Sequence, residues 1–308
     1  MGFRVAFPLC RARVSAPACR RPPASRRLPP AFQGVARLGA YRAQVPTRRS
    51  FLAGLAGTAA VLGSGVLSPA AATAALGVDP KSVAALNDGR RPTQWGMALP
   101  GIVTRFAPTG RQIALTFDAC SGACDNTLLN TLERYDAPAV LFICSRWIDA
   151  NPGRVEQLAA NPLFEIGNHG TRHVPLSVTG RSAYGIGGTK SADEAVAEVW
   201  TNQNRISALT GQSPSWYRTG TAHYDDVGVQ IVHELGLTPV GFSVNADNGA
   251  TSPAGKVGAA ITGATPGSIV LAHMNHPASG TAAGVATAIP ALSAAGWQFV
   301  RLAGQSVQ

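Results

Sequence analysis

Short apolar runs alternate with longer amphipathic segments from residue 111 to the end of the chain. The apolar runs predict strands at 112–117, 139–144, 164–166, 238–244, 268–272 and 297–302. Helical spacing of apolar positions predicts helices at 126–135, 154–160, 191–209, 227–235 and 282–295, the last bent or restarted at Pro290. Strands that are apolar throughout are typical of parallel sheets covered on both faces, so the pattern predicts a single α/β domain. The number of strand–helix units favours closure into a barrel over a small open sheet.

The segment before this pattern lacks the same periodicity. Residues 79–110 contain prolines at 80, 92, 100 and 108, which predict a loop-like N-terminal arm. We therefore expect an extension at 1–78, the arm at 79–110 and a folded domain at 111–308.

Charge is distributed unevenly along the chain. The 308 residues carry a formal net charge of +10, from 26 basic and 16 acidic side chains. Residues 1–78 contain eleven arginines and no Lys, Asp or Glu, which leaves 15 basic and 16 acidic side chains for 79–308. Because this larger part is close to neutral, it lacks the basic surface that nucleic acids require, and we expect no nucleic-acid partner.

The N-terminal extension has the features of an export signal. Arg48 and Arg49 form a twin-arginine pair, followed by an uncharged stretch at 51–78 and small-x-small cleavage sites within 70–74. That stretch is long enough to span a membrane, but its glycines and Pro69 make a poor membrane helix, so we expect no stable anchor. We expect export by the twin-arginine route to an extracellular, periplasmic or cell-wall location. Residues 1–46 are either a transit peptide or an over-extended start assignment.

Three cysteines lie in the body of the chain, at 120, 124 and 144. Their odd number in an exported protein is consistent with one disulfide and one spare thiol, and Cys120 could pair with Cys144 if the two end adjacent strands. The alternative is that all three are small buried apolar residues. Without matching CxxC pairs, a structural zinc site is not expected.

Ionisable residues follow several of the expected strands. In a parallel β/α fold the carboxyl ends of the strands meet at one rim, where active sites form. The residues expected at this rim are Asp118, His169, His173, Arg218, Asp247 and His273.

Two histidines spaced four residues apart are the sharpest local feature. His169 and His173 can bind one divalent cation together, with a carboxylate completing the protein ligands.

The remaining rim residues each allow a structural and a chemical role. Asp118 follows a buried strand and needs a partner, for which Arg218 is a candidate. This pair is either a structural ion pair, or Asp118 serves as a general base or metal ligand. His273 is either a core histidine or a general acid. Asp247 either fixes the tautomer of that imidazole or caps the turn at 248–249.

The order of these motifs resembles the polysaccharide deacetylases, also called NodB-homology carbohydrate esterases, over about residues 111–302. The matching segments are LTFD at 115–118, EIGNH at 165–169 continuing to His173, YRTG at 217–220 and LAH at 271–273. The resemblance implies a distorted (β/α) barrel. It also implies a divalent metal, usually zinc, and removal of acetyl groups, mostly from polymers of N-acetylglucosamine.

The resemblance further implies a role for each matching residue. His169 and His173 would bind the metal, Asp118 would be the general base, Arg218 would orient that base and His273 would be the general acid.

The chain departs from the family pattern where the third metal ligand is expected. The family's second motif aspartate is replaced by Ala119, and we expect Asp125 in the following loop to take its place. Alternatively Asp118 binds the metal, which would leave the base role to another group such as His223. The Arg motif also lacks its proline.

These features favour a metal-dependent deacetylase acting on a polysaccharide or cell-wall glycan, held mainly by shape and hydrogen bonds. A non-catalytic glycan-binding relative is the alternative from another class, and a hydrolase of another non-peptide C–N bond is the alternative within enzymes. The sequence leaves the oligomeric state open.

Overall fold

Parallel strands form the centre of the protein in a computed structural model that describes residues 77–308. The expectations for the twin-arginine pair, the cleavage sites and residues 1–46 lie outside the described residues. The sheet order is β8 (Thr238–Pro239), β6 (Trp216–Tyr217), β5 (Phe164–Asn168), β4 (Ala139–Ile143), β3 (Gln112–Ala119), β10 (Ile269–His273) and β9 (Val244–Asn245). Every neighbouring pair in this order is parallel. Within 77–308 the end strands β8 and β9 do not pair, so the barrel is open on one side.

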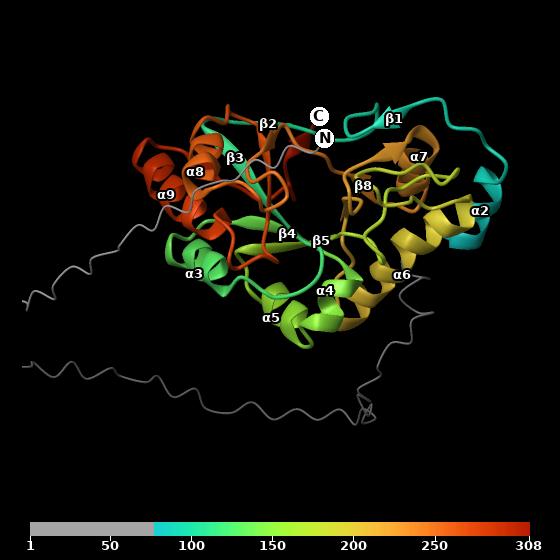
Figure 1. Cartoon of the computed structure of the whole chain (residues 1–308), viewed down its shortest axis with the longest axis horizontal. Helices are drawn as coiled ribbons and strands as arrows, with labels where there is room; N and C mark the ends of the chain where they lie inside the picture. The colour runs from blue at the N-terminus through green and yellow to red at the C-terminus, as the bar shows by residue number, and fades with distance from the viewer. Residues whose placement is uncertain (1–76) are drawn as a thin grey trace, which may run out of the picture. The chain divides into compact units, whose positions relative to one another are not determined.

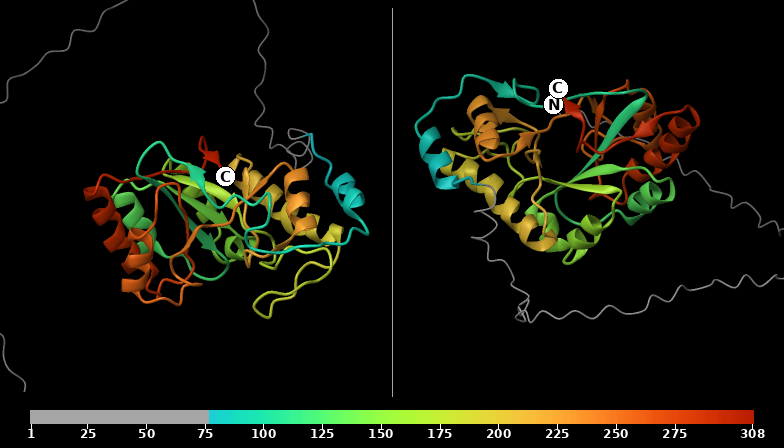
Figure 2. Two further views of the ribbon diagram at one scale, coloured as in Figure 1. Left: turned by 90° about the horizontal axis from the view of Figure 1, so that it is seen from above. Right: turned by 180° about the vertical axis from the view of Figure 1, so that it is seen from behind.

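Helices surround this sheet and connect its strands (Figure 1, Figure 2). They are α2 (Pro80–Asn87), α3 (Asn126–Arg134), α4 (Ser145–Ala150), α5 (Arg154–Ala160), α6 (Ala192–Thr210), α7 (Asp226–Glu234), α8 (Ala254–Thr262) and α9 (Thr281–Ala294). Helices α3, α8 and α9 pack together on one side, whereas α2, α6 and α7 pack together on the other. All described residues belong to one compact unit. The expected distorted (β/α) barrel in a single domain is confirmed.

Short elements close the ends of the structure. Strand β11 (Gln298–Phe299) pairs in parallel with the start of β3. Strand β1 (Trp95–Gly96) pairs antiparallel with β7 (Tyr224–Asp225), and β2 (Phe106–Ala107) pairs antiparallel with β12 (Ser306–Val307). Both β1 and β2 belong to the segment expected to be a loop-like arm, which is therefore paired to the domain at two places. No helix within the described residues is long and apolar enough to cross a membrane.

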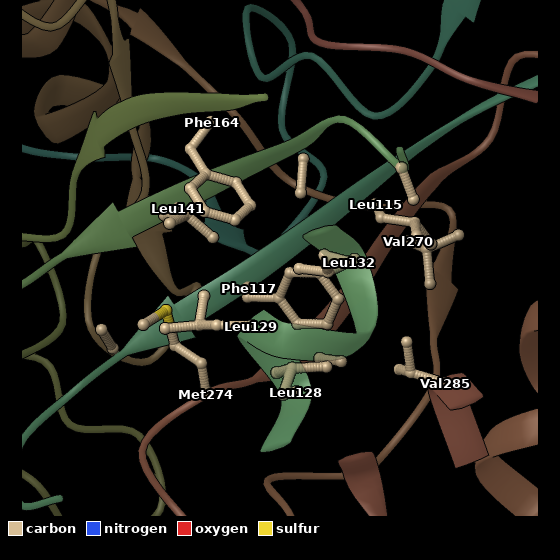
Figure 3. Close-up of a cluster of buried hydrophobic side chains, with 14 of the residues drawn as sticks. Leu115, Phe117, Leu128, Leu129, Leu132, Leu141, Phe164, Val270, Met274 and Val285 are labelled. Atoms are coloured by element: carbon tan, nitrogen blue, oxygen red, sulfur yellow. The ribbon is translucent and has the colours of Figure 1, made fainter. Parts of the chain in front are cut away.

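Strand β3 has two buried faces that serve different purposes. Residues 113, 115, 117 and 119 belong to the apolar core between the sheet and helices α3 and α9. In Figure 3 the Phe117 ring lies beside the leucines of α3. The opposite face of the strand carries Thr116 and Asp118, which both accept hydrogen bonds from Arg218. Alternation along one strand thus separates the hydrophobic core from a polar barrel interior.

The barrel interior is packed around the Phe142 side chain of β4. The guanidinium of Arg218 lies over its ring, 4.2 Å from the centroid. Gly167 on the neighbouring strand makes room for the ring, because a Cβ there would lie 2.6 Å from Cδ1 of Phe142.

Several elements differ from the sequence-based expectation, for identifiable reasons. The strand expected at 238–244 is interrupted after Pro239, where residues 239–241 hydrogen-bond to Val103 of the arm and a Cβ on Gly241 would lie 3.1–3.2 Å from atoms of residues 97, 102 and 104. Helix α2 forms inside the expected arm because Asp79 caps it, accepting from the backbone N–H groups of Lys81 and Ser82. Its Pro80 is tolerated because the first turn has no intrahelical partner for that nitrogen.

Helices α8 and α9, which pack against each other, both differ from the sequence-based expectation. Helix α8 was not expected because Gly255 and Gly258 weaken helix propensity. In the fold Gly258 permits close packing on α9, since a Cβ there would lie 2.8 Å from Oγ1 of Thr287. Helix α9 continues through Pro290 without restarting. The short α4 was also unexpected.

Gly167→Ala is expected to destabilise the protein by about 1–3 kcal/mol, because the added methyl group overlaps the Phe142 ring in a fully packed interior. Urea denaturation followed by circular dichroism measures the change in the free energy of unfolding. Gly187→Ala is the matched control, since a Cβ at Gly187 meets nothing within 4 Å. Equal stability of the Gly167 variant and wild type would contradict this description of the interior.

Candidate active site

The carboxyl ends of the central strands bring the expected rim residues together. Asp118 and His273 are direct partners in the register of β3 and β10. His169 follows the last residue of β5, and Arg218 follows the last residue of β6, which is paired to β5. The expected convergence of these side chains at one rim is present in the structure.

Asp118 and Arg218 form a buried ion pair. Oδ1 of Asp118 accepts a hydrogen bond of 2.8 Å from Nη1 of Arg218, and both side chains are almost fully shielded from solvent. Burial alone would raise the pKa of Asp118. The hydrogen bond and charge of the Arg218 guanidinium, together with the nearby imidazoles, outweigh burial and hold this pKa below its usual value of 3.8. Asp118 is therefore ionised at neutral pH and its orientation is fixed.

Arg218 is held by more than this carboxylate. Its Nε donates to the carbonyl oxygen of Val240 at 3.2 Å, its Nη2 to that of Gly241 at 2.9 Å, and its Nη1 to Oγ1 of Thr116 at 2.9 Å. The guanidinium thus spans the barrel from β3 to the chain just after β8. It donates hydrogen bonds to the carbonyl oxygens of Val240 and Gly241, which lie where the strand expected at 238–244 is interrupted.

His169 is fully buried with its two ring nitrogens facing different partners. Nδ1 lies 2.8 Å from the carbonyl oxygen of Arg218, to which only a protonated nitrogen can donate. Nε2 therefore carries the lone pair, and it lies 3.6 Å from Oδ2 of Asp118 and 3.6 Å from Sγ of Cys120. Burial lowers the pKa of His169 despite the neighbouring carboxylate, so the neutral form that binds metals is favoured.

His173 lies against His169, with the rings edge to face and their centroids 5.0 Å apart. Its backbone φ is +62°, a left-handed conformation unusual for a residue with a side chain. Burial lowers the pKa of His173 to about 3, and its Nε2 is buried without a hydrogen-bond partner. Gly220 allows this position, because a Cβ there would lie 2.5 Å from Cα of His173.

Glu198 on α6 holds the loop between these histidines and was not anticipated from the sequence. Its carboxylate accepts backbone hydrogen bonds from Thr171, Arg172 and His173 at 2.9–3.1 Å. The side chain of Arg172 also pairs with it at 3.2 Å. Burial raises the pKa of Glu198 even though these donors oppose the effect. A single glutamate within a helix does not reveal in the sequence that it will bind the backbone of His173, 25 residues earlier.

Cys120 joins the two histidines in a group suited to a metal ion. Its Sγ and one ring nitrogen each from His169 and His173 all lie within 4.8 Å of one another. Burial, and then the charge of Asp118, raise the pKa of the Cys120 thiol well above its ordinary value. Binding of a cation would reverse this by displacing the thiol proton. The chemistry of this donor set, together with the unpartnered nitrogen of His173, fits a divalent metal.

Asp125, which we expected to be the third metal ligand, has a structural role in the described residues. It is the N-cap of α3, where Oδ1 accepts the backbone N–H of Leu128 at 3.0 Å, and it does not belong to the group of potential metal donors. Capping satisfies a free N–H of the first helical turn, which the loop sequence did not distinguish from metal binding.

The three described cysteines are all free thiols, so the pairing considered for Cys120 and Cys144 is absent from the described structure. Cys144 is buried after β4, as the apolar alternative expected. Cys124 is partly exposed in the loop before α3.

His273 and Asp247 form the second polar pair of the rim. Nδ1 of His273 donates to Oδ1 of Asp247 at 2.9 Å, while Oδ2 accepts from the His273 backbone N–H and from Thr281. The Asp247 side chain thus engages the His273 imidazole, the first of the two roles considered for it, while Oδ1 of Asn245 accepts the backbone N–H of Asn248 in the turn at 248–249. Thr281, at the start of α9, was not anticipated.

A cavity of about 350 Å³ opens over these groups. Asp118, His173 and His273 line its floor, and Tyr184 and Ile186 line a wall formed by the 174–190 segment. His223 packs between Trp95 and Tyr184 at ring distances of 5.7 and 5.1 Å, and its Nδ1 lies 2.8 Å from the carbonyl oxygen of Thr221. The volume lies at the lower end of the range for small-molecule sites.

Comparisons with known proteins find similarity to polysaccharide deacetylases. Residues 107–240 match the family model described as polysaccharide deacetylase. The peptidoglycan-N-acetylglucosamine deacetylase PgdA of Listeria monocytogenes is 30% identical over 198 residues, covering 64% of this chain and 39% of the relative. The chain thus spans about two fifths of the length of the curated relatives it matches.

Solved structures agree on the fold. A CE4 family pseudoenzyme from Bacillus anthracis has a TM-score of 0.55 at 22% identity, covering 66% of this chain and 67% of that one. A family 4 carbohydrate esterase from Streptomyces lividans, in complex with acetate, has a TM-score of 0.55 at 21% identity, covering 65% and 98%.

Asp247→Asn is expected to lower the pKa of His273. Burial and the charge of Arg218 would lower that pKa. The hydrogen bond that His273 donates to Asp247 and the charge of Asp118 outweigh them, so the pKa of His273 in the wild-type protein lies above 6.5. An NMR titration of the His273 imidazole measures the difference. Asp226→Asn, at a surface carboxylate bonded to Thr93, is the control and should leave the value unchanged. An unchanged pKa in the Asp247 variant would contradict the assigned pairing.

Proposed function

We propose that this chain, which matches the polysaccharide deacetylase family model over residues 107–240, is a metal-dependent hydrolase that removes acetyl groups from a polysaccharide. The observation that carries the proposal is the convergence of Asp118 and His273 on one cavity beside His173. A carboxylate and an imidazole facing one substrate-sized space can supply a general base and a general acid.

Asp118 would accept a proton from the attacking water. It is ionised, it faces the cavity, and its hydrogen bond to Arg218 at 2.8 Å fixes where its second oxygen points. A base with its orientation already set loses little rotational freedom when the substrate binds.

His273 would protonate the leaving nitrogen or oxygen. Its Nδ1 is engaged by Asp247, so Nε2 is the nitrogen left for the substrate. The same carboxylate raises the pKa of His273, which favours the protonated form that a general acid needs.

The metal, for which we propose zinc, would polarise the acetyl carbonyl and lower the pKa of the attacking water. His169 and His173 would hold it. The hydrogen bond from Nδ1 of His169 to the Arg218 carbonyl orients that ligand, and the Glu198 carboxylate fixes the loop that carries His173.

The proposed substrate is a cell-wall glycan with N-acetyl or O-acetyl groups. The similarity to a peptidoglycan-N-acetylglucosamine deacetylase supports this class of substrate. The near-neutral charge of residues 79–308 also suits a sugar polymer held by shape and hydrogen bonds. We further propose export by the twin-arginine route, on the strength of Arg48 and Arg49, which would bring the protein to such a glycan.

A non-catalytic glycan-binding protein is the second candidate. Ala119 stands where the family motif has a carboxylate, and a pseudoenzyme is among the structural neighbours. Pure binding, however, gives no reason for an ionised Asp118 and a paired His273 to face the same cavity.

Asp118→Asn and His273→Gln are each expected to lower kcat for acetate release by roughly 10²–10⁴-fold, because each removes one proton-transfer group. Zinc-loaded protein is assayed with N-acetylglucosamine oligomers and with O-acetylated glycans. Treatment with a chelator should abolish release, and added zinc should restore it.

His276→Gln is the matched control, because His276 is exposed on the loop after β10. It should retain wild-type turnover. If wild-type protein with bound zinc binds these glycans but releases no acetate, the binding protein is the correct account. If the protein releases acetate from neither N-acetyl nor O-acetyl groups, but hydrolyses another C–N bond in a reaction that requires Asp118, it is a different hydrolase.

A further inference from the structure

We propose that Cys120 is the third protein ligand of the metal, so that a thiolate replaces the expected carboxylate. This rests on the proposed metal-dependent function and adds to it the identity of the donor atom. The site would be a mononuclear centre formed by Sγ of Cys120 and one nitrogen each from His169 and His173.

The spacing of the donor atoms supports this assignment. Sγ of Cys120 lies 3.6 Å from Nε2 of His169, and all three donor atoms lie within 4.8 Å of one another. With usual bond lengths to zinc, a tetrahedral arrangement separates a sulfur and a nitrogen ligand by about 3.6 Å. The two side chains thus already have the separation that a shared cation requires.

The partners of the two histidines direct their free nitrogens into this space. Nδ1 of His169 is engaged by the Arg218 carbonyl at 2.8 Å, which leaves Nε2 facing Cys120. Nε2 of His173 is buried without any hydrogen-bond partner. An unpartnered nitrogen at a buried position costs free energy unless a ligand engages it.

The two carboxylates considered as ligands each have one oxygen engaged elsewhere and are not in this group of donors. Oδ1 of Asp118 accepts from Arg218, which leaves Oδ2 at 3.6 Å from Nε2 of His169, and Oδ1 of Asp125 caps α3. Ala119 is the last residue of β3 and carries no donor, whereas Cys120 follows it directly, at the point where the strand opens into the loop. A thiolate also carries one negative charge, as a carboxylate does, so the net charge of the centre would be preserved.

A thiolate changes which metals the site prefers. Sulfur is a soft donor that suits zinc and cobalt, whereas magnesium, calcium and manganese prefer oxygen. The proposed centre would therefore discriminate against these hard cations more strongly than a site of two histidines and an aspartate.

Cobalt binding tests the assignment without reference to activity. The full chain is stripped with a chelator, kept reduced and titrated with Co²⁺ while the absorption spectrum is recorded. Wild type should show the near-ultraviolet charge-transfer band of a sulfur–cobalt bond together with tetrahedral visible bands. Cys120→Ala and Cys120→Asp should lack the charge-transfer band. Cobalt affinity of Cys120→Ala should fall by more than the roughly 10–100-fold that loss of an outer-shell partner costs.

Cys124→Ser and Cys144→Ser are the matched controls and should keep the band. Cys10→Ser and Cys19→Ser, at the two other cysteines of the full chain, should keep it too. If the Cys120 variants do not fold, which circular dichroism of the metal-free proteins reveals, retention of the band in all four of these variants assigns the sulfur to Cys120 by exclusion. Cobalt binding by wild type without the band, or a band that persists in Cys120→Ala, overturns the thiolate ligand and leaves metal dependence standing. No cobalt binding by wild type overturns both this inference and the metal-dependent function.

Discussion

The buried pair of Asp118 and Arg218 connects the barrel to its candidate chemistry. A guanidinium and a carboxylate that are both removed from water are tolerated only when their hydrogen bonds are satisfied. In this protein the guanidinium binds Asp118 and Thr116 on β3 and two carbonyls after β8, while Phe142 lies beneath it. The same contacts link β3 to the chain after β8 and fix the direction of the proposed base.

The remaining groups of the site are arranged around this pair in two sets. The backbone carbonyl of Arg218 orients His169, which lies between Asp118 and Cys120, so the proposed metal centre depends on where that arginine is held. On the other side, His273 is the register partner of Asp118 and is oriented by Asp247. In the proposed function, loop residues would supply the metal donors and strand ends the proton-transfer groups.

The sequence predicted the parts of this arrangement that depend on local pattern. The core strands at 112–117 and 139–144, and the residues that follow them, were predictable because apolar runs and strand ends are local features. The interruption after Pro239 was not, since residues 239–241 hydrogen-bond there to Val103 of the arm, which lies far away in the sequence. Helix α2 was obscured by the proline content of its segment, although Asp79 before Pro80 is a capping signal.

For the site, too, the sequence predicted which residues take part and their order along the chain. It did not predict the hydrogen-bond partners of these residues. Glu198 and Thr281 act through hydrogen bonds to residues far along the chain, which no spacing reveals. Asp125 was chosen as a ligand for its chemistry, whereas its position before α3 makes it a cap. Cys120 was weighed only as a disulfide or core residue, yet its place directly after the strand end was a usable signal.

The most direct test of the central pair is a double-mutant cycle between Asp118→Asn and Arg218→Met, with the free energy of unfolding measured by urea denaturation. Arg218→Met alone should cost about 3–5 kcal/mol, because it leaves a carboxylate buried without its partner. The double variant should be destabilised by less than the sum of the single changes, with a coupling of about 0.5–3 kcal/mol. Additive effects would show that the two side chains do not stabilise each other, and would contradict the central role of this pair in the fold and the site.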